Sequence, residues 1–162
     1  MTGDQKEKSI YHWYAIQCKG GESLRAAENL HRQGFEIFHP LVAKNDKKAR
    51  SEPLFPYYLF IRLSQVASNW RPIRSTRGVL RLVSFGDTPL PVPLSLIDML
   101  KAHASMCDGD PINHYIGLKP RLQPTSDSTT AKLSQLLDKR SGEERVIALL
   151  DIISRIQDPR TL

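Results

Sequence analysis

Residues 51–60 read SEPLFPYYLF, a stretch with two prolines, four aromatic side chains and one carboxylate, that of Glu52. It follows a lysine-rich polar segment, KNDKKAR at residues 44–50, which we expect to be the tip of a hairpin. Buried strands are usually continuous apolar runs without proline, and half-exposed strands usually alternate apolar with polar residues. The stretch fits neither pattern, so it raises the question of what its aromatic side chains contact.

The chain has the length of one ordinary domain, or of a small domain with an appendage, at 162 residues. Its hydrophobic content of 40% and charged content of 25% are those of a globular protein. No apolar run approaches the ~20 residues that a membrane helix needs, and the polar start MTGDQKEKSIYHW lacks a signal-peptide core. We therefore expect a cytoplasmic protein without membrane contact, in which Cys18 and Cys107 are reduced thiols.

The charge is basic and unevenly distributed, with a formal net charge of +6. The first 100 residues carry 14 of the 23 Lys and Arg residues and 9 of the 17 Asp and Glu residues. Clustered cations gain free energy when they displace counterions from phosphates. The basic first part therefore favours a nucleic-acid partner, although many basic proteins bind no nucleic acid.

Strand and helix patterns alternate through the first 103 residues. Tyr11–Cys18 is aromatic and β-branched like a strand, and residues 22–33 form a helical pattern with Leu24, Ala27, Leu30 and His31 on one face. Further strands are expected at 35–38, 54–63 and 79–85, and Pro93 opens a helix over 94–103. This order predicts a ferredoxin-like α+β fold, an antiparallel sheet with helices on one face.

The rest of the chain has a different texture. Prolines, glycines and aspartates between 107 and 124 predict a linker over 104–126. Residues 127–162 then predict a helical hairpin, because Ser141 to Glu144 has the spacing of a capping box. One apolar stripe comprises Leu133, Leu136 and Leu137, and the other comprises Val146, Leu149, Leu150, Ile153 and Ile156. A two-helix hairpin cannot bury such stripes alone, and several of these residues are β-branched, so it needs another surface.

Sequence motifs for catalysis or metal binding are not apparent. The five histidines lack zinc-ligand spacing, and neither a phosphate-binding Gly-x-x-x-x-Gly-Lys loop nor a Gly-x-Ser-x-Gly elbow occurs. We therefore expect a protein that is not an enzyme and needs no cofactor or metal.

Cationic and polar side chains form a better candidate site, for DNA. Lys19 ends the first strand, and Arg25, Asn29 and Arg32 share one helix face. Arg74, Thr76 and Arg77 precede the strand at 79–85. Lysine and arginine bind phosphates, and arginine also offers a planar fork to base edges. The alternative for each cation is an ordinary solvated surface charge.

Four collinear blocks resemble the NusG family of transcription elongation factors, and within it the specialised RfaH subfamily. They are WYAIQCK (13–19), SEPLFPYYLF (51–60), STRGV (75–79) and GEERVIALLDIISR (142–155). The resemblance implies that residues 1–103 form the family's N-terminal domain, which binds the β′ clamp helices of RNA polymerase and, in RfaH, the non-template DNA strand. It implies that residues 127–162 mask the polymerase site as an α-hairpin, which in RfaH refolds into a β-barrel when released.

The resemblance also assigns roles to particular residues. Tyr58 and Phe60 lie two apart and hence on one face of a strand, and with Phe85, Ile97 and Leu100 they would form the polymerase-binding patch. The alternative is that these residues pack the sheet against its own helix. Phe55 and Leu59, on the opposite face, are the better core candidates. The residues implied to cover the patch are Leu137, Val146, Leu149, Leu150 and Ile153. Glu52 and Arg145 would form an ion pair at the edge of this interface.

For DNA, the resemblance favours Lys19, Arg25, Thr76 and Arg77, and the sequence departs from RfaH nearby. Gly20 replaces a basic residue and Asn29 replaces a histidine. Residues 68–72 replace a run that contacts the polymerase β gate loop, which leaves that contact open. Residues 118–132 lack the barrel's Gly-x-Phe-x-Gly motif and contain two prolines, so we expect the helical form to be favoured. Recruitment of ribosomes or termination factors is left open for the same reason.

Together these features predict an operon-specific elongation and antitermination factor that is monomeric and autoinhibited by its C-terminal hairpin. Two other functions remain open: a DNA-binding regulator that does not act on polymerase, and a module that binds some other coiled coil. Co-purification with core RNA polymerase separates the first function from the second, and deletion of the β′ clamp helices tests the third.

Overall fold

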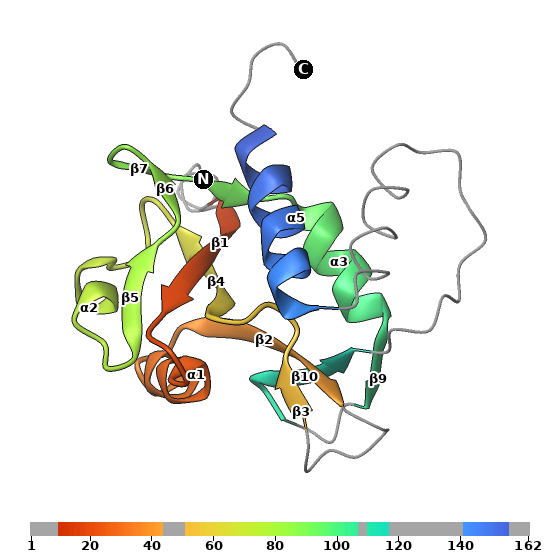
Figure 1. The fold of residues 1–162 in the computed structure, drawn as a ribbon. Helices are drawn as coiled ribbons and strands as arrows, with labels where there is room; N and C mark the ends of the chain where they lie inside the picture. Colours follow the sequence, from red (N-terminus) through yellow and green to blue (C-terminus); the bar gives the residue numbers. More distant parts are fainter. Residues whose placement is uncertain (1–9, 44–50, 107–109, 117–140, 156–162) are drawn as a thin grey trace, which may run out of the picture.

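A computed structural model describes residues 10–43, 51–106, 110–116 and 141–155 of the chain. At its centre β1 (Tyr11–Cys18) lies between β4 (Tyr58–Ser64) and β5 (Val79–Leu82). β2 (Glu36–Ala43) pairs with the other edge of β4, which gives the order β5-β1-β4-β2 (Figure 1). All three pairings are antiparallel, so the predicted α+β fold with an antiparallel sheet is confirmed for these four strands.

Within the described ranges, the other elements are short strands and four helices. The helices are α1 (Ser23–Arg32), α2 (Arg71–Arg74), α3 (Leu94–Ala102) and α5 (Gly142–Arg155). The strands are β3 (Ser51–Pro53), β6 (Ser84–Phe85), β7 (Thr88–Pro89), β8 (Pro91–Val92), β9 (Ala104–Met106) and β10 (Asn113–Ile116).

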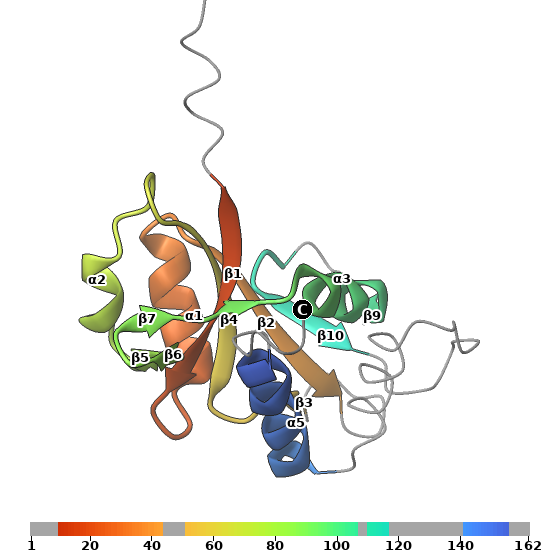
Figure 2. The same ribbon diagram turned by 90° about the horizontal axis from the view of Figure 1, so that it is seen from above.

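Helices cover both faces of the sheet, with α1 and α2 on one side and α3 and α5 on the other (Figure 2). The alternation of side chains along β4 explains why, because Leu59 and Ile61 face α1 while Phe60 faces α5. Each face therefore carries large apolar side chains that must be buried. The sequence predicted helices on one face of the sheet only, and the structure has them on both faces.

Two strands extend the sheet beyond β2, within the segment where a linker was expected. β10 pairs in parallel with β2 and antiparallel with β9, so the sheet is mixed. A turn starts β10, because the carboxylate of Asp110 accepts the backbone N–H groups of Ile112 and Asn113 at 2.9 and 3.0 Å. β4 and β3 pair with one edge of β2, and β10 covers the other edge, which would otherwise be open. Residues 117–126 of the expected linker lie outside the described part.

The strand expected over 79–85 is two separate strands. Its second part, β6, pairs with β7 across a two-residue turn at Gly86 and Asp87, where Gly86 has a positive φ of 62°. Pairing of β5 with β1 ends at Leu82, so this small hairpin leaves the main sheet. Because Phe85 belongs to this hairpin, its side chain is not covered by the main sheet.

The stretch at 51–60 is interrupted by a turn rather than being one strand from residue 54. The backbone N–H of Tyr58 donates to the carbonyl of Phe55 at 3.0 Å, which closes the turn. Pro53 and Pro56 favour the interruption because neither has an N–H group for a strand ladder. Tyr57 has a φ of 72°, a positive value that is uncommon outside glycine.

The predicted second helix of the hairpin is present as α5, and it begins where the capping box was predicted. The backbone N–H of Glu144 donates to Ser141 Oγ at 3.1 Å. Leu149 and Ile153 are one turn apart and fully buried, so burial outweighs the low helix propensity of the β-branched residues. The predicted first helix, including Leu133, Leu136 and Leu137, lies outside the described residues, as does the predicted stop at Asp158.

Candidate functional site

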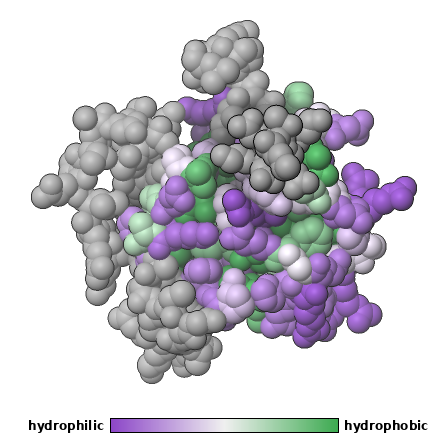
Figure 3. Space-filling model, turned by 180° about the vertical axis from the view of Figure 1, so that it is seen from behind, coloured by the Kyte–Doolittle hydropathy of each residue, from purple (hydrophilic) through white to green (hydrophobic). Residues whose placement is uncertain are grey.

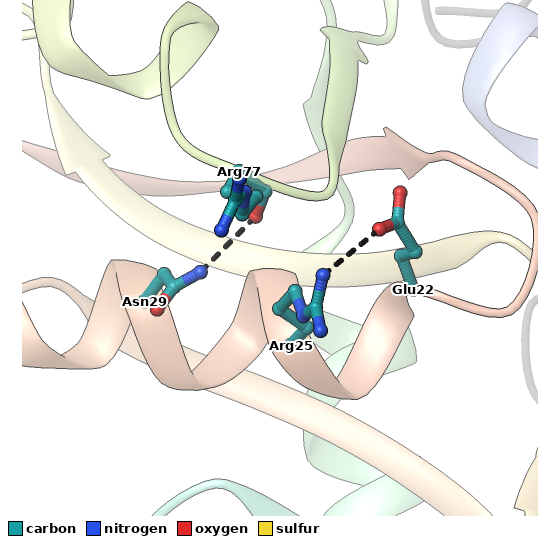
Figure 4. Close-up of polar contacts among 4 residues, drawn as sticks. All are labelled: Glu22, Arg25, Asn29 and Arg77. Carbon is teal, nitrogen blue, oxygen red and sulfur yellow. Dashed lines mark hydrogen bonds and ion pairs between the residues drawn. The ribbon is translucent and has the colours of Figure 1, made fainter.

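The loop that carries the predicted DNA-binding arginines is held against α1. Gly78 has a φ of 95°, and a Cβ at this position would lie 3.0 Å from the Cβ of Ala26, so the close approach needs glycine. Asn29 Nδ2 donates to the carbonyl of Arg77 at 3.3 Å (Figure 4). The buried face of α1 includes Ala26, Ala27 and Leu30. Leu24 was predicted to lie on the apolar face, but its side chain is 45% exposed. His31 is exposed as well.

Thr76 supports this loop from inside. Its side chain is buried, its hydroxyl donates to the carbonyl of Pro72 at 2.8 Å, and it accepts from Gln33 Nε2 at 2.8 Å. The sequence predicted that Thr76 faces DNA, but burial and these two bonds place it beneath the surface. Its contribution in this structure is to fix the backbone that leads to Arg77.

The remaining predicted DNA-binding cations lie at the surface. Lys19, Arg74 and Arg77 are exposed. Arg25 pairs with Glu22 at 3.4 Å, and solvent reaches both side chains (Figure 4). An exposed pair of this kind contributes only ~0–1 kcal/mol, so Arg25 can exchange its partner for a phosphate. Viewed from behind, hydrophilic side chains gather over the α1 end of the molecule (Figure 3).

Two polar residues at this surface were missed by the sequence analysis. Gln33, which bonds Thr76, lies one turn beyond Asn29, so the i, i+4 spacing was a usable signal. Arg81 is exposed on β5, and its Nε donates to Gln17 Oε1 at 2.9 Å. That contact depends on the register of β5 against β1, which the sequence alone does not provide.

The predicted polymerase-binding residues are mostly buried in one cluster beneath α3 and α5, which we call the α5 cluster. Tyr58 is 8% exposed, and Phe60 is fully buried. The cluster also contains Ile97 and Leu100 of α3 and Leu149 and Ile153 of α5, with Val146 and Leu150 partly buried at its border. The sheet therefore packs on its own helix α3, as the alternative interpretation expected, and α5 also covers this cluster.

Two aromatic residues lie elsewhere than predicted. Phe55 was expected in the core on the face opposite Phe60, yet its ring meets that of Phe60 edge-on, 5.7 Å apart between centroids, in the α5 cluster. The turn before Tyr58 breaks the strand alternation on which the prediction relied. Phe85 was expected beneath the C-terminal helical hairpin. Its side chain is instead 75% exposed, because the β6–β7 hairpin leads away from the sheet. Leu59 does lie in the core of the opposite face.

Arg145 lies inside the interface rather than at its exposed edge. It is 2% exposed, and its Nε donates to the backbone carbonyl of Leu54 at 2.7 Å. Burial lowers the pKa of the Arg145 guanidinium, while the negative charges of Glu52 and Glu144 raise it. The predicted partner Glu52 therefore acts on Arg145 electrostatically, and the backbone bond is a second anchor that was not predicted.

A close approach of backbone to proline accompanies this anchor. A Cβ at Gly142 would lie 2.5 Å from Pro56 Cγ, so the start of α5 fits against the 54–57 turn only with glycine. The 51–57 segment thus contacts α5 through its backbone, a proline and a carboxylate.

Catalytic or metal chemistry gains no support from the described residues. Among them, no group of three or more His, Cys, Asp or Glu side chains could hold a metal ion. Burial raises the pKa of the Cys18 thiol to about 12, which keeps it protonated and unreactive. None of the helices in the described ranges has the length and apolar character to cross a membrane.

Comparison with known proteins gives a family match and similarity to solved structures. The family described as NusG, transcription termination factor nusG, matches residues 11–101, more than half of the chain. A solved structure titled "Domain interaction in Thermotoga maritima NusG" is similar at 24% sequence identity with a TM-score of 0.45. That similarity covers 54% of this chain and 54% of the other, so it spans about half of the length of the Thermotoga protein.

Proposed function

The chain belongs to the NusG family of transcription factors, and from this premise we propose that it is an RfaH-like, autoinhibited elongation factor. Members of this family are not enzymes, and membership implies binding to RNA polymerase. In our proposal the protein joins paused polymerase in the cytoplasm as a monomer and suppresses termination on particular operons. It contacts the β′ clamp helices and the exposed non-template DNA strand.

The observation that carries the proposal is the position of α5. A helix from the far end of the chain covers Tyr58 and Phe60, the residues proposed to bind polymerase. A large apolar patch marks an interaction site when it is uncovered. A buried patch cannot bind a partner, so α5 must leave before the clamp helices can dock.

Phe85 has a separate place in the proposal. Because it is 75% exposed while α5 is docked, it is accessible to polymerase before release. We propose that Phe85 makes the first apolar contact and that Tyr58, Phe60, Ile97 and Leu100 follow when α5 leaves. Leu137, which lies outside the described residues, is proposed to contribute to the cover.

The DNA part of the proposal is supported by exposed cations on a preformed surface. Arg77 is held by Asn29, while Lys19, Arg25 and Arg74 extend the positive charge around it. Such a surface binds phosphates without large reorganisation, because its loop is already fixed on α1.

Capture of the protein by immobilised core RNA polymerase tests the proposal. Ile153→Asp introduces a charge at a fully buried position of α5 and should release the helix, which raises capture severalfold over wild type. Ile147→Asp is the matched control, since Ile147 is on the same helix but 69% exposed, and it should behave like wild type. Polymerase that lacks the β′ clamp helices should capture neither variant.

Equal capture of all three proteins would contradict autoinhibition by α5. Capture that persists without the clamp helices would contradict the proposed docking site. Run-off transcription on templates with pause sites, with and without the protein, then shows whether bound protein changes elongation.

A further inference from the structure

A pocket of about 490 Å³ opens at the start of α1, beside the basic surface and distinct from the α5 cluster. Its lining includes an exposed cation, an aromatic ring, two aliphatic side chains and a polar floor. These are Lys19, Tyr57, Leu24, Leu41, Ser23 and Asn113, and the carboxylate of Glu52 also lines the pocket. Lys19 also belongs to the proposed DNA surface, so the pocket and that surface are continuous.

Tyr57 is the residue whose conformation the fold alone does not explain. Its φ of 72° is strained for a bulky residue, and glycine or asparagine would adopt it more readily. The side chain is nevertheless 52% exposed, and the site for a Cβ on Gly20 is 3.6 Å from its ring. The backbone at Tyr57 is fixed, because its carbonyl accepts the N–H of Cys18 at 2.6 Å. A strained turn thus presents an aromatic ring to solvent at the wall of a pocket.

The floor of the pocket is a chain of hydrogen bonds that fixes its polar groups. Asn113 Nδ2 donates to the carboxylate of Asp110 at 3.0 Å, which turns its Oδ1 toward His39 Nδ1 at 2.8 Å. His39 Nδ1 must then carry the proton, so His39 Nε2 accepts from the hydroxyl of Ser23 at 3.1 Å. The orientation of these groups is set before any ligand arrives.

We propose that this pocket binds one unpaired base of a single DNA strand whose phosphates lie on the adjacent cations. Proteins bind single strands by combining cations along the backbone with aromatic side chains on which bases stack. Tyr57 provides the ring, Lys19 the neighbouring cation and the fixed floor the hydrogen-bonding groups. The inference rests on the proposed DNA-binding function, and it adds a stacking position outside the arginine surface.

A double-stranded partner fits this site less well, because its bases are stacked inside the helix. The pocket is present in the structure with α5 docked, although its lining residue Pro56 also lies against Gly142 at the start of α5. The full chain can therefore be tested without prior release of α5.

The test measures binding of the full chain to fluorescein-labelled (dT)12 by anisotropy at several salt concentrations. Tyr57→Gly removes the ring and suits the positive φ, so the protein should stay folded while affinity falls about fivefold or more. The slope of log affinity against log salt should not change, because no cation is lost. Lys19→Ala should instead reduce that slope by about 0.7. Tyr57→Asn, which also tolerates a positive φ, gives a second ring-free variant.

A strand of twelve abasic sites, with the same charge as (dT)12, is the control ligand. It should bind wild type and Tyr57→Gly equally. Unchanged affinity of both ring-free variants for (dT)12, with a loss in Lys19→Ala, would overturn the pocket and leave the basic surface intact. No binding of (dT)12 to wild type would overturn the proposed DNA function and this inference together. Tighter, Tyr57-dependent binding of (rU)12 would overturn the assignment to DNA.

Discussion

The two faces of the sheet are closed by helices that reach them in different ways. The α1 face is covered by the helix that directly follows β1, and small side chains such as Ala26 and Ala27 let it lie close. The α5 face carries large aromatic side chains and is covered partly by α3 and partly by a helix from the other end of the chain. Both faces bury large side chains, and the α5 face depends on a helix that is separated from the sheet by a long stretch of chain.

The difference separates what maintains the fold from what can change. Elements that open at low free energy are those with few anchors to the rest of the molecule. Among the described contacts, α5 is anchored by two buried side chains, by the bond of Arg145 to Leu54 and by the fit of Gly142. We therefore expect the α1 face to resist perturbation as part of the domain and the α5 face to open as a unit.

The largest effect is expected on the α1 face. Leu59 is fully buried there, so Leu59→Ala should lower the free energy of unfolding of the whole domain by about 2–5 kcal/mol. Urea denaturation followed by circular dichroism measures this loss. A decrease below about 1 kcal/mol would mean that this face is not the stable part of the molecule.

The matched substitution on the other face is Ile153→Ala, at a position 1% exposed. We expect about 2 kcal/mol to be lost from docking of α5, at the low end for such a truncation because a shifted helix can partly refill the cavity. Hydrogen exchange should accelerate in α5 and stay unchanged in β1 and β4. Equal acceleration in the strands would show that the two faces unfold as one unit.

A smaller effect is expected from Arg145→Ala, which leaves the buried carbonyl of Leu54 without its donor. The loss in docking should be about 1–3 kcal/mol. The same exchange measurement on α5 reads it out, and wild-type exchange in the variant would contradict the anchoring role.

The charge of Glu52 can be separated from this backbone bond by reversal. Glu52→Lys should open a fraction of molecules, because it places a cation beside Arg145. The double variant Glu52→Lys with Arg145→Glu should restore docking only in part, since glutamate cannot donate to Leu54. Full restoration would show that charge alone fixes α5.

The smallest effect concerns pH and should be confined to the α1 face. Burial lowers the pKa of His39 below its ordinary value of 6.5, against the smaller raising effects of Asn113 and Asp110. The unfolded chain therefore binds a proton more readily than the folded one, so stability should fall as pH drops below about 6.5. Urea midpoints between pH 7.5 and 5.5 test this. His39→Gln should flatten the dependence, and an unchanged slope would exclude His39, leaving His114, whose pKa is also lowered, as the source.

Local features of the fold were predictable because they depend on neighbouring residues. The bounds of β1 agree with the prediction, and the capping box at Ser141 marks the start of α5. Tyr58 and Phe60 share a face as their spacing requires. These predictions use strand alternation and hydrogen bonds between close neighbours, which the sequence encodes directly.

Two of the failures have the opposite property, since they depend on contacts between distant segments. β10 forms from a Gly- and Asp-rich segment only because β2 offers it an edge. Thr76 is buried beside α1, where Gln33 donates to its hydroxyl. Phe55 and Phe85 lie elsewhere than predicted for a local reason, because turns at residues 54–57 and 86–87 change the direction of their strands. Local patterns give the elements, but they do not give the partners that each element meets.

The place of α5 in the chain has a consequence for biosynthesis. The last residue of α3 is 102, and α5 begins at 142, so the ribosome adds the intervening segment after the aromatic residues and the α3 residues of the α5 cluster. At about 5–20 residues per second, that interval lasts roughly 2 to 8 s. For that time the nascent domain presents an uncovered apolar face, which is a hazard for aggregation. Newly made protein is therefore open before α5 can close over this face.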